Sequence, residues 1–353
     1  MVLETFGRYE LLKKLATGGM GQVFLARQKG LGGFQKLLVV KRVLPHLSEE
    51  EEFIEMFLDE ARIAALLNHP NIAQLFEMGQ VDGIYFIAME YVHGESLRQL
   101  VNTAQQKRGG LPVAFKVRIV AEAAAGLDYA HKALSQSGRP LGLIHRDVSP
   151  QNVLVGFNGS VKVIDFGVAK AANKISTTTA GAIKGKYPYM SPEQARGEEL
   201  DHRSDVFGLG IVLYEVLTQT RLFKRDTDTA TLRAVVGSKI TPPSGVVDGL
   251  PKALDTIVLK ALARKRDERF QSAGELQIAL EEFLVSERLP ANAALLSSYM
   301  RALYADRLEE EQAASEPTQI HFDIHAARAQ REAKPPEPST PPAPPSKRER
   351  RKS

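Results

Sequence analysis

The sequence predicts an α+β protein with two lobes, a small lobe that combines a five-stranded sheet with one helix and a larger, mainly helical lobe. The chain has 353 residues, which is long for one hydrophobic core. Its composition, 43% hydrophobic and 25% charged, is ordinary for a globular protein. Residues 9–91 alternate as strands and turns do, whereas the pattern after Gly94 has the spacing of helices.

The small lobe is expected to contain the whole sheet. Apolar residues recur at helical spacing from Phe53 to Leu67, which predicts one helix over about 50–67. The run 68–71, which includes Pro70, stops this helix. The expected strands cover residues 9–12, 21–26, 37–41, 72–77 and 84–91.

The larger lobe is expected to be built from helices over 97–101, 114–131, 204–218, 253–263 and 273–285. Pro290 then opens a segment with an apolar stripe from Leu295 to Tyr304. This segment either packs back on the large lobe or binds a partner. The expected organisation is a domain over 9–285, with lobes over 9–92 and 93–285, a helical extension over 286–312 and a disordered Pro-rich tail over 313–353.

The net charge of +4 comes from the end of the chain. Residues 334–353 hold six Lys and Arg against two Glu, and the other residues balance at 40 basic and 40 acidic groups. We therefore expect no nucleic-acid surface on the folded body. The prolines and basic end of the tail suit docking to a partner or to an anionic surface, and a solubilising tail is the alternative.

The chain contains no cysteine, which excludes disulfides, thiolate metal sites and a cysteine nucleophile. No segment approaches about eighteen consecutive apolar residues, and the first residues do not look like a signal peptide. The sequence therefore predicts a cytoplasmic protein without a transmembrane segment. Its oligomeric state stays open.

Residues 143–165 carry the groups that phosphoryl transfer needs. Asp147, in a His-Arg-Asp triplet, offers a carboxylate that can accept a hydroxyl proton, Asn152 an amide oxygen for a metal ion, and Asp165 a second carboxylate for metal and phosphate. Apolar runs on both sides of an Asn-Gly turn at 158–159 predict two short strands between these groups. The alternative is an acidic loop beside a buried hairpin.

With these motifs in this order, the chain closely resembles the protein kinases with serine/threonine specificity, in particular the bacterial eukaryotic-like (Hanks-type) members. The resemblance covers about residues 9–285. Its glycine-rich loop over ATP corresponds to Gly18, Gly19 and Gly21, while Ala16 replaces the family's first glycine. Glycine allows backbone amides to approach a phosphate where a β-carbon would collide. A plain hairpin turn is the alternative.

Lys41 ends a predicted strand, as the phosphate-orienting lysine of this family does. An ammonium group on a buried strand needs a partner. The resemblance implies that Glu60, on the inner face of the predicted helix, pairs with Lys41, and that Lys41 holds the α- and β-phosphates. The alternatives are an edge lysine and a solvated helix carboxylate.

Residues 87–92 resemble the family's hinge. The resemblance implies that the backbone carbonyl of Glu90 and the backbone amide of Val92 hydrogen-bond the adenine ring, with Met89 at the back of the pocket. The side chains expected to enclose the ring are Val23, Val39 and Leu154. As side chains alone, these residues cannot be told from core residues.

The resemblance also implies three supporting residues in the large lobe. Glu193, at the end of the activation segment, is expected to pair with Arg269. Asp205 is expected to brace the catalytic loop. These roles are structural and not catalytic.

Two positions depart from the family pattern. The residue two after the catalytic aspartate is normally lysine and is Ser149 here, and the usual threonine of the activation segment is Lys186. One hypothesis is an exchange, in which Lys186 supplies the ammonium group and Ser149 the hydroxyl, so that positive charge near the transferred phosphoryl group is retained. The alternative is that Ser149 is a tolerated loss and Lys186 a solvated loop lysine.

Hydroxyl residues cluster between Asp165 and Glu193, which makes them candidates for phosphorylation. A phosphate there would carry about −2 charge and could pair with Arg146, which would order the segment. An ordinary polar loop is the alternative. The candidates are Ser176, Thr177, Thr178 and Thr179.

The sequence thus predicts an ATP- and Mg²⁺-dependent protein kinase that phosphorylates serine and threonine hydroxyls of protein substrates. Asp147 orients the substrate hydroxyl, Asn152 and Asp165 hold Mg²⁺, and Lys41 orients ATP. A pseudokinase-type signalling scaffold is the alternative, supported by the missing glycine and the missing lysine. A small-molecule phosphotransferase has no reason to carry the activation segment, whose Tyr-Met-Ser-Pro-Glu-Gln end favours serine and threonine over tyrosine as acceptors.

Overall fold

A computed structural model describes residues 2–18, 21–30, 33–48, 50–135, 137–166 and 187–314. Within these ranges, the side chains at 45, 52, 56, 59, 60, 63 and 314 lie outside the description. The predictions for Gly19, Lys186, Ser176, Thr177, Thr178 and Thr179 therefore fall outside the described residues, as does the side chain of Glu60. The described residues up to Ala305 form one compact unit, and the described residues from Asp306 onward belong to a second.

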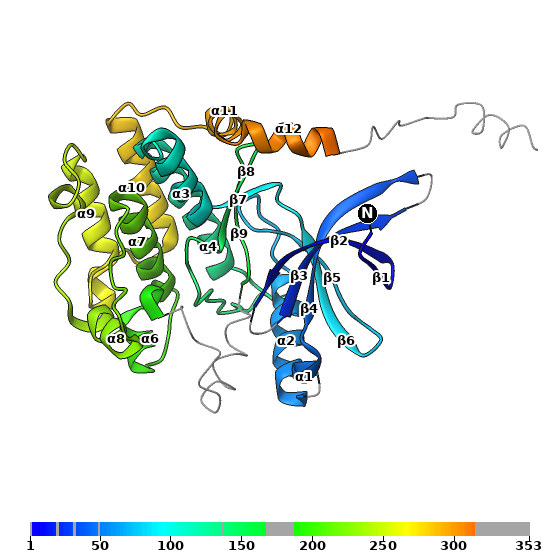
Figure 1. The fold of residues 1–353 in the computed structure, drawn as a ribbon. Helices are drawn as coiled ribbons and strands as arrows, with labels where there is room; N and C mark the ends of the chain where they lie inside the picture. The colour runs from blue at the N-terminus through cyan, green and yellow to red at the C-terminus, as the bar shows by residue number, and fades with distance from the viewer. Residues whose placement is uncertain are drawn as a thin grey trace, which may run out of the picture. The chain divides into compact units, whose positions relative to one another are not determined.

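The small lobe contains an antiparallel sheet with the strand order β1-β2-β3-β4-β6-β5 (Figure 1). The two-lobed fold is confirmed, and the structure adds one strand to the five that were predicted. This strand, β1, has three residues and one buried side chain, which is too short for an alternating pattern to show. The strands are β1 (Glu4–Phe6), β2 (Tyr9–Thr17), β3 (Gly21–Lys29), β4 (Gln35–Val43), β5 (Leu75–Val81) and β6 (Ile84–Glu90).

The two faces of this sheet have different roles, because successive side chains of a strand point to opposite faces. On β4, Leu38 and Val40 belong to a buried cluster with Tyr9 and Phe86. The other face of β4 carries Lys41. It also carries Val43, which packs against the second cluster formed with helix α2 (Glu51–Ala64). The short helix α1 (Pro45–Ser48) precedes α2.

The large lobe is helical and is organised around α7, in which every residue from Ser204 to Thr218 is buried. A small sheet of β7 (Gly94–Ser96), β8 (Val153–Gly156) and β9 (Val161–Val163) lies between the helices and the small lobe (Figure 1). The helices are α3 (Leu97–Arg108), α4 (Val113–His131), α6 (Pro192–Arg196), α7 (Arg203–Thr218), α8 (Asp228–Gly237), α9 (Lys252–Ala261) and α10 (Ala273–Ser286).

Two more helices follow α10, namely α11 (Ala293–Leu303) and α12 (Ala305–Ala314). Asn292 caps α11, with its side-chain oxygen accepting the backbone N–H of Leu295 at 2.9 Å. Helix α11 belongs to the first compact unit. Among the helices in the described ranges, none is both long and apolar enough to cross a membrane.

Candidate active site

The β8–β9 hairpin brings the three predicted phosphoryl-transfer residues together. Its register pairs Val153 with Val163, so the residues just before β8 and just after β9 are neighbours. Accordingly, the Ile164 N–H donates to the Asn152 carbonyl at 3.0 Å. The Asn152 side-chain amide donates to the Asp147 carbonyl at 2.8 Å and to the Asp147 carboxylate at 3.2 Å.

Asp205, in the first turn of α7, fixes the catalytic loop by hydrogen bonds to its backbone. Its carboxylate accepts the backbone N–H groups of His145 at 2.7 Å and Arg146 at 2.9 Å, and it contacts Nε2 of His131 at 2.8 Å. Burial acts to raise the pKa of Asp205, but the hydrogen bonds and charges of its partners prevail and lower it. The predicted bracing contact is confirmed. It supports Arg146 at φ +66°, a backbone conformation that non-glycine residues rarely adopt.

His145 connects this loop to Ile164 and Phe166, the two neighbours of Asp165, a role that was not predicted from the sequence. Its Nδ1 accepts the Asp147 N–H at 3.2 Å, so its Nε2 donates to the Ile164 carbonyl at 2.9 Å. The ring also meets the edge of Phe166 at 4.8 Å between centroids. The signal was present as the first residue of the His-Arg-Asp triplet.

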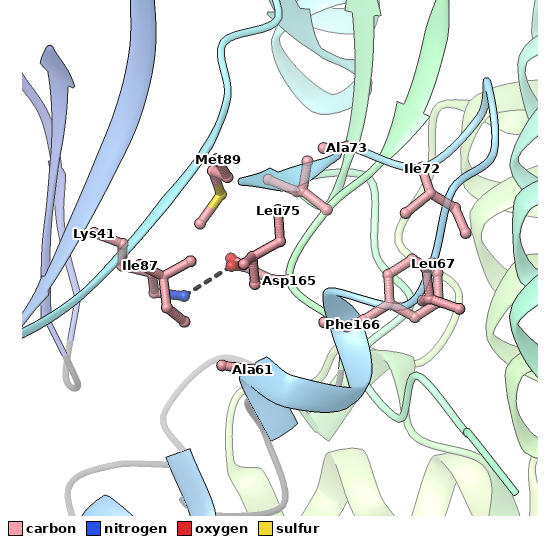
Figure 2. Close-up of a pocket in the computed structure, with 12 residues that line it drawn as sticks. Lys41, Ala61, Leu67, Ile72, Ala73, Leu75, Ile87, Met89, Asp165 and Phe166 are labelled. Carbon is pink, nitrogen blue, oxygen red and sulfur yellow. Dashed lines mark hydrogen bonds and ion pairs between the residues drawn. The ribbon is translucent and has the colours of Figure 1, made fainter. Parts of the chain in front are cut away.

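Lys41 reaches from the sheet to Asp165, with 2.7 Å between Nζ and Oδ1 (Figure 2). The side chain of Lys41 is only 14% exposed, so it requires a partner of this kind. The partner that the structure shows is Asp165, and the pairing with Glu60 stays a prediction. Asp165 itself has φ +60°, a second strained residue in the site.

The register of the sheet places the predicted adenine-lining side chains beside Lys41. Val23 lies opposite Lys41 in the β3–β4 pair, and Val39 lies opposite Met89 in the β4–β6 pair. Opposed residues share a face of the sheet, so these side chains point into the same space. Leu154, on β8, is half-buried in the large lobe.

Behind Met89 the site continues into a small cavity of about 40 Å³ (Figure 2). Ala61 and Ala64 of α2 line it together with Ile87 and Phe166. Small alanine side chains on the helix leave this space open.

The glycine-rich turn is closed by a hydrogen bond from the Gly18 N–H to the Gly21 carbonyl at 2.9 Å. A β-carbon at position 21 would collide with the backbone carbonyl of Arg42 on the neighbouring strand. Gly21 is therefore required by strand packing, whatever else the turn binds.

The hinge is fixed by Glu90, whose side-chain role the sequence analysis also missed. The Glu90 N–H donates to the Gln74 carbonyl at 2.8 Å, and its carboxylate accepts the Gln74 N–H at 3.1 Å. The carboxylate also pairs with Lys162 of β9 at 2.9 Å. Val92 lies two residues after Glu90, so both predicted adenine contacts lie on a segment held by the two lobes.

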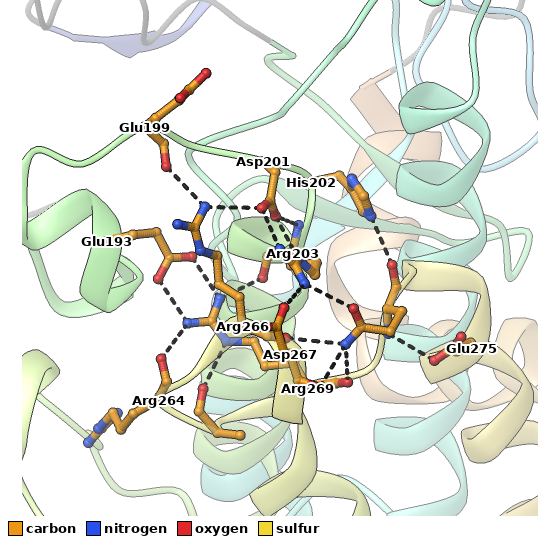
Figure 3. Close-up of polar contacts among 12 residues, drawn as sticks. Glu193, Glu199, Asp201, His202, Arg203, Arg264, Arg266, Asp267, Arg269 and Glu275 are labelled. Carbon is orange, nitrogen blue, oxygen red and sulfur yellow. Dashed lines mark hydrogen bonds and ion pairs between the residues drawn. The ribbon is translucent and has the colours of Figure 1, made fainter.

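The predicted pair of Glu193 and Arg269 is confirmed and is bidentate, with distances of 2.7 and 2.8 Å (Figure 3). Ser204 donates a further hydrogen bond to Glu193 at 2.7 Å. Burial acts to raise the pKa of Glu193, but the Arg269 and Ser204 contacts lower it overall. Close by, the bonds from Arg203 outweigh burial and lower the pKa of Asp201 to about 2.

A buried cluster fixes the end of the activation segment to α3 and α7. The Tyr189 hydroxyl donates to Glu215 at 2.7 Å, and Arg98 bonds both Tyr189 and Glu215. Burial raises the pKa of Tyr189. These residues are far apart in the sequence and match no local motif, so sequence reasoning could not group them.

The donor set fits Mg²⁺, which prefers a few carboxylate or amide oxygens together with phosphate and water. The side-chain nitrogen of Asn152 is directed to Asp147. The side-chain oxygen of Asn152 therefore points away from Asp147. Asp165, which supplies a carboxylate, directly follows Ile164, whose N–H bonds the Asn152 carbonyl.

Comparison with known proteins agrees with this geometry. The family model described as the protein kinase domain matches residues 9–279, and the chain belongs to this family. The chain therefore contains a protein kinase domain, with a sheet-rich small lobe and a helical large lobe.

Relatives share much of the chain. The tyrosine-protein kinase MasK of Myxococcus xanthus is 44% identical over 306 residues, 86% of this chain and 47% of its own length. The serine/threonine-protein kinase PknB of Mycobacterium leprae is 39% identical over 77% of this chain and 42% of its own length. The chain thus spans about half the length of the curated relatives that it matches. A match covering 86% has to reach α11, even if it starts at the first residue.

A solved structure gives the same result. The crystal structure of the Mycobacterium tuberculosis PknI kinase domain matches with a TM-score of 0.59 and 28% sequence identity. The match covers 79% of this chain and 97% of the PknI chain.

Proposed function

We propose that the chain is an ATP- and Mg²⁺-dependent kinase that phosphorylates serine and threonine side chains of proteins. The observation that carries this proposal is the convergence of Asp147, Asn152, Asp165 and Lys41 on one site. Asp147 would orient the acceptor hydroxyl and accept its proton, and Lys41 would orient the α- and β-phosphates. Asn152 and Asp165 would hold Mg²⁺, which neutralises charge on the phosphates when bound.

The proposed nucleotide site lies between the lobes. Adenine would bond the carbonyl of Glu90 and the amide of Val92, between Val23 and Val39 above and Leu154 below, with Met89 behind. Gly18, Gly19 and Gly21 would cover the phosphates, and Glu60 would pair with Lys41 in the working arrangement. Because such a kinase needs ATP, the proposed location of the domain is the cytoplasm.

The acceptor residue is the part of this proposal most in need of a test, because MasK is named a tyrosine kinase. The activation-segment end favours serine and threonine, and PknB is named for that specificity. Three peptides that differ only in carrying serine, threonine or tyrosine should be incubated with the full chain, Mg²⁺ and labelled ATP. Label on serine and threonine supports the proposal, and label confined to tyrosine refutes it. The Asp147→Asn chain serves as the blank, and no transfer above it with any acceptor would favour a pseudokinase.

We further propose that Lys186 replaces the catalytic-loop lysine missing at Ser149. Lys186→Thr should then lower turnover by ~10²-fold, as expected for a positioned charge that acts on a transition state. Ser149→Lys alone should place two ammonium groups together and also impair turnover. The double variant recreates the usual family pair and should recover much of the loss, which makes the cycle non-additive. Additive losses without rescue would show that Lys186 is an ordinary loop lysine.

Two proposals concern regulation. Autophosphorylation within residues 175–180, on Ser176, Thr177, Thr178 or Thr179, would create a charge that can pair with Arg146. Mass spectrometry of active protein would test this, and phosphate found only elsewhere would refute it. The tail from 313 would dock a protein partner or an anionic surface through its prolines and basic end.

A further inference from the structure

Helix α11 is firmly docked on the kinase body, although it begins after the last residue of the matched kinase domain. Leu296 and Met300 are fully buried, and Leu303 and Tyr304 are nearly so. Lys107 and Arg108, at the end of α3, donate to the carbonyls of its last turn at 3.4 and 3.2 Å. Cations at this end also complement the helix dipole.

The surface that α11 covers is the back of the β8–β9 hairpin. Ser297 donates its hydroxyl to the Phe157 carbonyl at 2.8 Å. The Tyr304 ring meets the Phe157 ring with 5.6 Å between centroids. At the hairpin turn, Gly159 has φ +80°, and a β-carbon there would collide with the carbonyl of Ala293. The turn and the helix are therefore in direct backbone contact.

Phe157 also contacts His93, the residue that directly follows the hinge. Its N–H donates to the His93 carbonyl at 2.9 Å, and the His93 ring meets its ring edge-on at 4.8 Å. The His93 ring in turn stacks on Tyr91 at 6.0 Å. Phe157 thus bonds the residue after the hinge through its amide and α11 through its carbonyl.

The strand before Phe157 carries Leu154, and β7, which follows the hinge, pairs with that strand. A shift of Phe157 therefore moves both the hinge segment next to Val92 and the side chain of Leu154. The hinge segment and Leu154 line two different sides of the proposed adenine pocket.

We propose that α11 positions the hinge for ATP, with Ser297 and Tyr304 as positioning residues that act through Phe157 and His93. This inference rests on the proposed function, because it takes the hinge as the adenine site. Loosening α11 should weaken nucleotide binding and leave the phosphoryl-transfer residues in place.

The test uses the full chain and its Ser297→Ala, Tyr304→Ala and Tyr304→Phe variants. Ser298→Ala is a matched control, because the Ser298 hydroxyl is exposed and bonds only the Ala294 carbonyl of its own helix, at 3.0 Å, among the contacts described. Calorimetric titration with ADP and Mg²⁺ gives the Kd. Steady-state kinetics gives KM for ATP, KM for the peptide and kcat.

Ser297→Ala should raise the Kd for ADP and the KM for ATP by about threefold to tenfold, the factor expected for one lost hydrogen bond. Tyr304→Ala should raise the Kd for ADP and the KM for ATP at least as much. Tyr304→Phe keeps the ring and should leave both values as in the unaltered chain. The kcat at saturating ATP and the KM for the peptide should stay within about twofold. Ser298→Ala should match the unaltered chain.

An unchanged Kd for Ser297→Ala and Tyr304→Ala would overturn this inference while leaving the proposed function intact. A fall in kcat without a change in KM for ATP would overturn it as well. If Tyr304→Ala fails to fold, the comparison of Ser297→Ala with Ser298→Ala decides the matter alone. An unaltered chain that binds no ADP would refute the proposed function together with this inference.

Discussion

Replacing Asp205 by asparagine should separate the positioning of the catalytic loop from its chemistry. Asp205 is 2% exposed and accepts hydrogen bonds at 2.7 and 2.9 Å from two successive backbone amides, as well as the contact with His131. Asparagine keeps the shape but has one acceptor oxygen and a donor in place of the other. If the oxygen serves His145 and His131, the new amide group faces the N–H of Arg146.

The magnitude follows from these contacts. One hydrogen bond to an ionised acceptor is lost, which costs about 1.5–3 kcal/mol, and the partly buried Arg146 N–H is left opposite another donor. We expect the free energy of unfolding to fall by about 3 kcal/mol. The conformation of Arg146 at φ +66° is itself worth about 1–3 kcal/mol of strain, so the residue should relax once its bond is gone. Asp147 is the next residue, and its displacement should lower kcat by roughly 10²-fold.

The assay compares Asp205→Asn with Asp201→Asn. Asp201 also accepts several bonds, from Arg203 and Arg266, but it does not belong to the catalytic loop (Figure 3). Chemical denaturation gives the stability, and peptide phosphorylation at saturating ATP gives kcat. Both variants should lose stability, and only Asp205→Asn should lose kcat. The reasoning is refuted if Asp205→Asn keeps its kcat, or if both variants lose kcat equally.

Further outcomes are expected from single changes. Asp165→Ala should nearly abolish transfer of labelled phosphate, although thermal unfolding should show that the variant is folded. Transfer at the unaltered rate would contradict the assignment of this site. Arg269→Met should lower the free energy of unfolding by about 3–5 kcal/mol, because the charge of Glu193 is left buried and unpaired; Arg269→Lys is the control and should lose less. The lowered pKa of Glu193 means that its contribution to stability is present above its ordinary value of 4.5 and is lost as the pH falls through the folded value; in Arg269→Met, denaturation at low pH should show that this loss has disappeared. Truncation after Glu311 should leave peptide phosphorylation unchanged, and a large loss would assign the tail a part in the chemistry.

The sequence predicted elements well where local signals were strong. The Asn-Gly turn and its flanking apolar runs gave the β8–β9 hairpin, and the long apolar periodicity of α4 gave its bounds to within a residue. Helix α8 was missed, because only Thr231, Ala234 and Val235 of it are buried and they leave a weak pattern. The strand predicted at 72–77 begins at Leu75, since Ile72 pairs instead with Val163 of the large lobe.

For the site, motifs supplied residues but not their partners. Asp147, Asn152 and Asp165 could be named from spacing, because they flank one hairpin. The partner of Lys41 could not be named from spacing, because Lys41 and Asp165 lie 124 residues apart in the sequence and meet only through the packing of the two lobes. The docking of α11 on the hairpin could not be predicted for the same reason. The apolar stripe predicted that one face of the helix is packed, but it did not indicate which part of the protein it packs on.

The way the catalytic loop is held also makes the question of Ser149 answerable. The loop is fixed because the backbone N–H groups of the two residues before Asp147 donate to Asp205, and the Asn152 amide donates to Asp147. Ser149 contributes its backbone carbonyl, which accepts the Asn152 N–H at 3.0 Å, and any residue offers that group. Among the described residues, the hydrogen bonds that hold Asp147 and Asn152 therefore use the backbone of Ser149 and not its hydroxyl. Because Ser149 is only 6% exposed, a kinetic change caused by substitution at 149 is assigned to charge near the transferred phosphoryl group only where denaturation shows that the stability is unchanged.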